Sequence, residues 1–101
     1  MAEIDTVKRL EQHMSICQEM NDLYKRKNMD YGDSFHKSYL KEGMAMPRIR
    51  IGDKFNRFKT LSRQKIQMVK TETLRDTLID LANYAIMTVM ELDSAEGDSN
   101  E

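Results

Sequence analysis

The chain has 101 residues, of which 33% are charged, and its net charge is −1. This length fits one small domain with a thin hydrophobic core, which oligomerisation would complete. The sequence has no apolar run of transmembrane length and no signal-peptide core at its start, and one cysteine with two histidines makes no zinc-type ligand set. We therefore expect a cytoplasmic protein without a membrane partner.

The charge is distributed unevenly along the chain. Residues 37–70 contain ten basic and two acidic residues, a net charge of +8, and the remainder carries −9. This segregation indicates either an anionic ligand or pairing between oppositely charged helices. Nucleic acid ranks last among the ligands, because the basic residues share a helix with apolar ones and are not interleaved with aromatic side chains.

The residue pattern predicts an all-α fold with three main helices and one or two short ones. The first main helix begins at Asp5 or Thr6 and runs to about Lys27, since apolar residues recur at helical spacing. Residues 28–33 are typical of a turn, and a short helix through Leu40 follows. The apolar row of the first helix consists of Val7, Leu10, Met14, Cys17, Met20 and Tyr24.

A second main helix is predicted over roughly Arg48–Gln64. We expect its buried face to consist of Ile51, Phe55, Phe58 and Leu61. Three basic residues, Arg50, Lys54 and Arg57, follow each other at intervals of one helical turn and form a basic ladder.

The last predicted helix spans Thr71–Leu92 and is apolar around more than half of its circumference, which is typical of a helix at the centre of a bundle. Its remaining face carries an acidic ladder that consists of Glu72, Asp76 and Asp80, with Asn83 beside it. Beyond Leu92 the sequence is acidic and polar. We therefore expect a single helical domain over residues 1–92 and a disordered tail over residues 93–101.

The two ladders allow two interpretations. Carboxylates are the ligands that Mg²⁺ prefers, and arginine binds phosphate oxygens through two N–H groups at once, so the ladders could form the two walls of a nucleotide site. Alternatively, they pair with each other as salt bridges between helices, and periodicity alone favours this structural interpretation. Tyr31 could similarly stack on a base or fill a hydrophobic gap, and Asn83 could contact a ligand or hold a core network.

Three segments together resemble a known family. They are Asn28–Phe35 (NMDYGDSF), Ile51–Phe58 (IGDKFNRF) and Asp76–Ala85 (DTLIDLANYA). In order and spacing they resemble the first nucleotide modification associated domain family of phages and bacteria, which is distantly similar to the MazG-like all-α NTP pyrophosphatases.

The resemblance implies a helical bundle, dimeric or of higher order, that handles nucleoside phosphates inside a bacterial host cell. MazG-like enzymes use Mg²⁺ held by paired acids to split an NTP into a monophosphate and pyrophosphate. On this resemblance Asp76 and Asp80 would be the catalytic metal ligands, with Glu19 as a substitute for one missing acid. The first acid pair of those enzymes is absent, because Asp53–Arg57 is basic where the enzymes are acidic.

We therefore expect a phage-type protein that binds a nucleotide or nucleotide-like molecule. Its phosphates would contact Arg50, Lys54 and Arg57, and its base or sugar would lie near Tyr31 and Asn83. The incomplete acidic set leaves two alternatives, a Mg²⁺-dependent NTP pyrophosphohydrolase and a non-enzymatic protein. The latter would be a nucleotide sponge or an inhibitor of a host protein in phage–host conflict.

Overall fold

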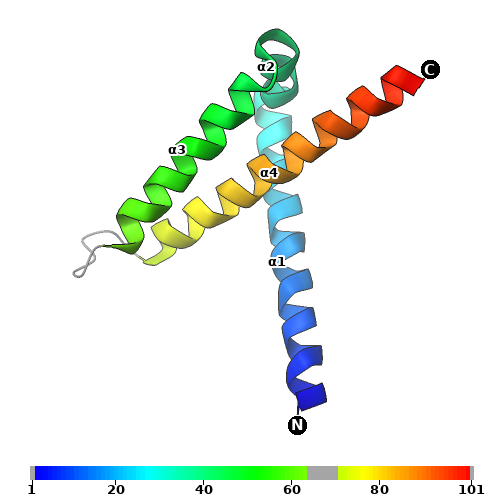
Figure 1. Ribbon diagram of the computed structural model, residues 1–101. Helices are drawn as coiled ribbons and strands as arrows, with labels where there is room; N and C mark the ends of the chain where they lie inside the picture. Colours follow the sequence, from blue (N-terminus) through cyan, green and yellow to red (C-terminus); the bar gives the residue numbers. More distant parts are fainter. Residues whose placement is uncertain (1, 64–70, 101) are drawn as a thin grey trace. The chain divides into compact units, whose positions relative to one another are not determined.

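The computed structural model describes the backbone of residues 2–63 and 71–100 and the side chains of residues 5–63 and 73–95. Over these backbone ranges the chain forms four α-helices and no strand, which confirms the all-α prediction with three main helices and one short helix. The helices are α1 (Ala2–Tyr31), α2 (Ser34–Glu42), α3 (Ala45–Ser62) and α4 (Thr71–Asn100) (Figure 1). No described helix combines the length and the hydropathy that crossing a bilayer requires.

The chain divides into two compact units, residues 1–33 with α1 and residues 34–101 with α2, α3 and α4. The first unit is a single helix without a core of its own. The prediction of one domain over residues 1–92 therefore stays a prediction.

Helix α1 continues past the predicted end at Lys27 and ends at Tyr31. There the N–H of Gly32 donates to the carbonyl of Asn28, and Gly32 has a φ of 60°. A glycine in this left-handed conformation is a common end of an α-helix, as the sequence predicted for this turn. Of the apolar row expected to be buried, Met20 is buried, whereas three members are 53–70% exposed; these are Val7, Leu10 and Met14.

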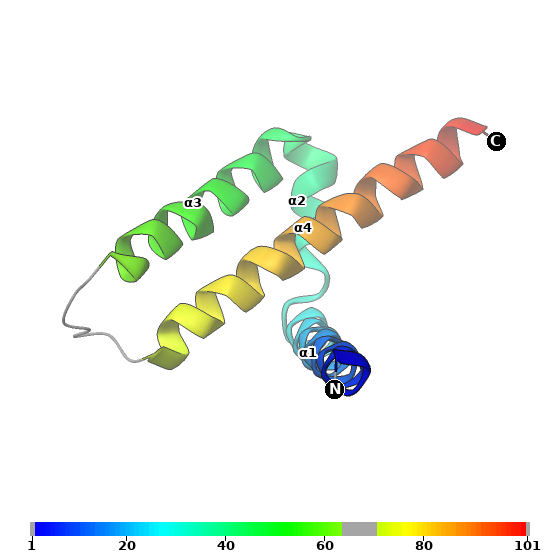
Figure 2. The same ribbon diagram turned by 60° about the horizontal axis from the view of Figure 1, so that its bottom comes forward.

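In the second unit, α3 and α4 lie side by side and run in opposite directions, and α2 contacts both (Figures 1 and 2). A small core holds the three helices together. Pro47 is fully buried in the first turn of α3, where a missing N–H costs no helical hydrogen bond. The other buried apolar side chains are Phe35, Met46, Leu61 and Ile79.

The junction between α2 and α3 is a left-handed glycine. Gly43 has a φ of 69°, and its N–H donates to the carbonyl of Tyr39 at 2.8 Å, which closes the last turn of α2. Helix α3 then begins at Ala45, earlier than the predicted Arg48.

The predicted buried face of α3 is only partly correct. Leu61 is buried and Ile51 and Phe58 are half-buried, but Phe55 is 48% exposed. The Lys59 ammonium lies over the Phe55 ring, 5.1 Å from its centre, and offers this exposed ring a favourable electrostatic contact.

Helix α4 turns a side that is polar in large part toward the rest of its unit. Thr77, Asn83 and Glu91 are buried, whereas five large apolar side chains on this helix are 41–54% exposed. These are Leu78, Ile86, Val89, Met90 and Leu92. Helix α4 therefore contacts the rest of its unit through polar residues as well as through Ile79, and much of the apolar surface expected at the centre of a bundle is exposed in the chain.

Helix α4 also extends beyond the predicted end. Residues 93–100, for which we expected a disordered tail, continue the helix to Asn100. This stretch contains Ala95 and no proline, and a single glycine costs a helix only about 1 kcal/mol relative to alanine.

Candidate functional site

One side of α3 forms the basic wall of a hollow. Arg50, Lys54 and Arg57 lie one turn apart on this side, and they line the hollow together with Asp53 and with Tyr84 of α4. Its volume is about 260 Å³. Three cationic side chains around one aromatic residue make this hollow suitable for an anion that also has a planar or polar part.

The basic and acidic ladders meet at one ion pair. The Lys54 ammonium lies 3.1 Å from the Asp80 carboxylate, and the two side chains are 28% and 22% exposed. This contact places Lys54 of the basic ladder opposite Asp80 of the acidic ladder, across α3 and α4. Within the described residues, Asp76 is exposed and makes no ion pair.

The structural interpretation of the ladders is therefore correct for one pair only. Arg50 and Arg57 are exposed and make no ion pair with any described residue. Their guanidinium groups remain available to a ligand in the hollow. The Glu72 side chain, the third member of the acidic ladder, lies outside the described residues.

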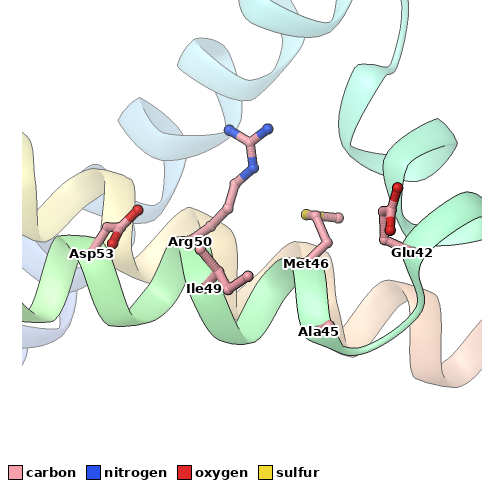
Figure 3. A pocket seen from close by; sticks show the side chains of 6 residues that line it. All are labelled: Glu42, Ala45, Met46, Ile49, Arg50 and Asp53. Carbon is pink, nitrogen blue, oxygen red and sulfur yellow. The ribbon is translucent and has the colours of Figure 1, made fainter.

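A second, more apolar hollow of about 350 Å³ adjoins the first, and Arg50 and Asp53 belong to both. In Figure 3, Arg50 projects from α3 between Met46 and Asp53. The remaining lining residues come from the end of α2 and the start of α3; they are Glu42, Ala45 and Ile49. Because the hollows share Arg50, one extended ligand could reach both.

Two contacts from α2 fix the position of α4 next to the hollow. The rings of Phe35 and Tyr84 stack with their centres 6.0 Å apart and an angle of 18° between their planes. Farther along α4, the Nδ1–H of His36 donates to both carboxylate oxygens of Glu91, at 2.7 and 2.9 Å. An ionised carboxylate can only accept, so the proton lies on Nδ1.

A comparison with known protein families finds a match for most of the chain. The model of nucleotide modification associated domain 1 matches residues 27–92. The chain belongs to this family. The match includes every residue that lines the two hollows, and it ends at Leu92 inside α4. No curated protein and no solved structure matches the chain.

Membership of the nucleotide modification associated domain 1 family confirms the first part of the resemblance seen in the sequence. The similarity to MazG-like pyrophosphatases and the phage origin stay predictions, because the family match bears on neither.

The described side chains alone do not make up the magnesium site that the MazG resemblance implies. Within the described residues, no three histidine, cysteine or carboxylate side chains are grouped so that they could hold a metal ion. Asp80 is paired with Lys54, and a lysine ammonium at a metal ligand opposes the binding of a cation. Glu19 belongs to α1, in the other unit of the chain, and is exposed. We therefore assign no metal-dependent step to these residues.

The predicted base-contacting residues do not line the two hollows. Tyr31 is the last residue of α1, in the first unit of the chain, and is 69% exposed, so both interpretations of this residue stay predictions. Asn83 is buried and has an interaction partner, in agreement with the expectation for a polar side chain in the core.

Three residues that now define the site were not predicted to belong to it. Tyr84 follows the predicted Asn83 in an otherwise apolar helix, and helical spacing alone does not show that it faces the basic residues of α3. Met46 and Asp53 gave no local signal for a ligand, because a buried methionine and a helical aspartate are common in any bundle.

Proposed function

We propose that this domain binds a nucleoside phosphate in the two adjoining hollows of the α3 side. Arg50, Lys54 and Arg57 would contact the phosphate oxygens, and the apolar hollow around Met46 would receive the base and sugar. The proposal is carried by one observation, the three cationic side chains that line one hollow with Tyr84. Membership of a nucleotide modification associated family supports it.

The charges in the basic hollow favour a ligand with several phosphates. Asp80 neutralises Lys54 and Asp53 adds one negative charge, but Arg50 and Arg57 lack ion pairs within the described residues. Each additional phosphate oxygen can accept a charged hydrogen bond from these guanidinium groups. Such a bond contributes about 1.5–3 kcal/mol.

The proposed activity is binding without hydrolysis. Asp80 is paired with Lys54, and no three metal-binding side chains are grouped among the described residues, which favours binding over metal-dependent hydrolysis. The protein would then retain a nucleotide without changing it. This activity corresponds to the nucleotide sponge that we considered as the non-enzymatic alternative. The identity of a host partner plays no part in this proposal.

The test is calorimetric titration with nucleoside mono-, di- and triphosphates. We expect affinity to rise with the number of phosphates and to fall with salt, since the contacts are ionic. Arg50→Gln and Arg57→Gln should each weaken triphosphate binding about tenfold or more. Arg48→Gln is the matched control, because Arg48 is exposed on the same helix and lines neither hollow.

Two results would overturn the proposal. If the Arg48 variant loses as much affinity as the Arg50 and Arg57 variants, then the binding is unspecific charge attraction. If a product assay with Mg²⁺ shows pyrophosphate release that disappears in Asp80→Asn, then the domain is an enzyme and the binding-only activity is wrong.

A further inference from the structure

The exposed side of α4 is apolar from Leu78 to Leu92. Leu78, Ala85, Val89 and Leu92 follow each other at intervals of seven, four and three residues, so they share one side of the helix. The three large members are 41–54% exposed, and Ile86 and Met90 widen the same surface. Monomeric proteins rarely expose a continuous apolar surface of this kind.

The opposite side of α4 is already occupied by its own unit. Thr77 and Glu91 are buried there, and Asp80 is paired with Lys54 of α3. Rotation of the helix to bury its apolar side would break this pair and the contact between His36 and Glu91. Within the second unit, α2 and α3 therefore leave the apolar side of α4 uncovered.

The charges at the two ends of this apolar side indicate what covers it. Among the described side chains, Arg75 and Asp93 bound the surface, both lie at the same edge of it, and the residues between them on this side are uncharged. If a second α4 ran parallel, two-fold symmetry would place the charged edges of the two helices on opposite sides of the interface, and these charges would not meet. If it runs antiparallel, each Arg75 lies by the partner's Asp93, and the charges attract.

Residue size along the surface fits the same arrangement. Ala82 and Ala85 lie midway between Arg75 and Asp93, and larger side chains flank them, with Leu78 on one side and Val89 on the other. An antiparallel pair centred on the alanines lets the helices approach closely and places each Leu78 by the partner's Val89. A surface that complements itself in this way is typical of a two-fold symmetric dimer.

We propose that the apolar side of α4 binds the same side of α4 in a second copy of this chain, with the two helices antiparallel. The interface lies on the side of α4 away from α3, so the hollows described above stay open in the dimer.

The mass of the full chain in solution, measured by light scattering during size-exclusion chromatography, tests the proposal. We expect the mass of two chains at micromolar concentration. Ala85→Lys should give the mass of one chain with unchanged helical circular dichroism, because Ala85 is exposed and a lysine there meets only the partner. Asn56→Lys, on an exposed position of α3, is the matched control and should remain dimeric.

A charge exchange tests the orientation. Arg75→Asp and Asp93→Arg should each weaken dimerisation roughly tenfold, because each creates two like-charged pairs in the dimer. The double variant should restore the dimer, since it exchanges the two charges of each pair and opposite charges again lie next to each other. A monomeric wild-type chain would overturn the proposal, and so would a double variant that dimerises no better than the single variants.

Discussion

The contact between His36 and Glu91 shows how single residues hold the second unit together. The Glu91 side chain is only 10% exposed, and both of its oxygens accept from the same imidazole N–H. A buried carboxylate needs such a partner, because its removal from water costs free energy. If no donor replaces the lost hydrogen bonds to water, this cost is not offset. The His36 ring therefore allows Glu91 to be buried between α2 and α4.

Replacement of His36 should consequently destabilise the fold. His36→Ala leaves Glu91 buried without this partner, and we expect the free energy of unfolding in urea to fall by about 1–2 kcal/mol. His13→Ala serves as the control and should change it by less than about 0.5 kcal/mol, because His13 is exposed on α1. Glu91→Gln in the His36→Ala background should recover part of the loss. Equal effects of the two histidine variants would contradict this role.

Local patterns in the sequence could not reveal this pair. His36 and Glu91 are 55 residues apart, and an isolated histidine gives no sign of its partner. The same holds for Phe35 and Tyr84, whose stacking depends on how α2 docks against α4. Contacts within one helix, such as the basic ladder of Arg50, Lys54 and Arg57, were predictable because helical geometry alone fixes their spacing.

At the scale of helices, two glycines have opposite effects on the stability of the fold relative to alanine. Gly43 ends α2 with a φ of 69°, a conformation in which an L-residue with a Cβ atom is strained. Gly52 lies inside α3 with ordinary helical backbone. A Cβ atom at either position would meet no other atom within 4 Å, so backbone conformation alone decides the effect of alanine.

The same substitution at the two sites should therefore have opposite signs. Gly43→Ala should lower the free energy of unfolding by about 1 kcal/mol, and Gly52→Ala should raise it by about 0.5–1 kcal/mol. Thermal and urea unfolding of both variants under one set of conditions provides the measurement. A stabilised Gly43 variant would show that this residue is not held in the left-handed region.

The helices were predictable from the sequence, but the sides that they present to one another were not. Apolar spacing located three main helices and placed α4 at the centre of a bundle, but it did not reveal which residues of α4 contact α3. Asp80 has an oppositely charged partner on α3, so part of the polar side is packed inward. Hydrophobicity alone does not reveal such a partner on another helix.

At the scale of the whole molecule, the exposed apolar side of α4 should make the thermal stability of the fold depend on protein concentration. If a second chain covers this side, folding and association are linked, and the unfolding temperature depends on protein concentration. Sequence length already indicated that a chain of 101 residues has a thin core. The structure adds the location of the surface that would complete it.

A tenfold increase in protein concentration should therefore raise Tm by about 3–5 °C. Ala85→Lys should remove this dependence and lower Tm at all concentrations, because the variant folds as a single chain. Differential scanning calorimetry over two decades of concentration is the appropriate measurement. A wild-type Tm that stays constant over this range would show that the folded chain gains no stability from a second copy.

The shortness of α2 has a consequence for the order in which the molecule loses structure. A helix of nine residues is not stable in water by itself, and the left-handed residues Asp33 and Gly43 bound it at both ends. Its backbone therefore stays helical only while Phe35 and His36 remain docked on α4. Once these two contacts open, the amide hydrogens of α2 lose protection together and exchange with solvent as one cooperative group, before those of the longer α3 and α4.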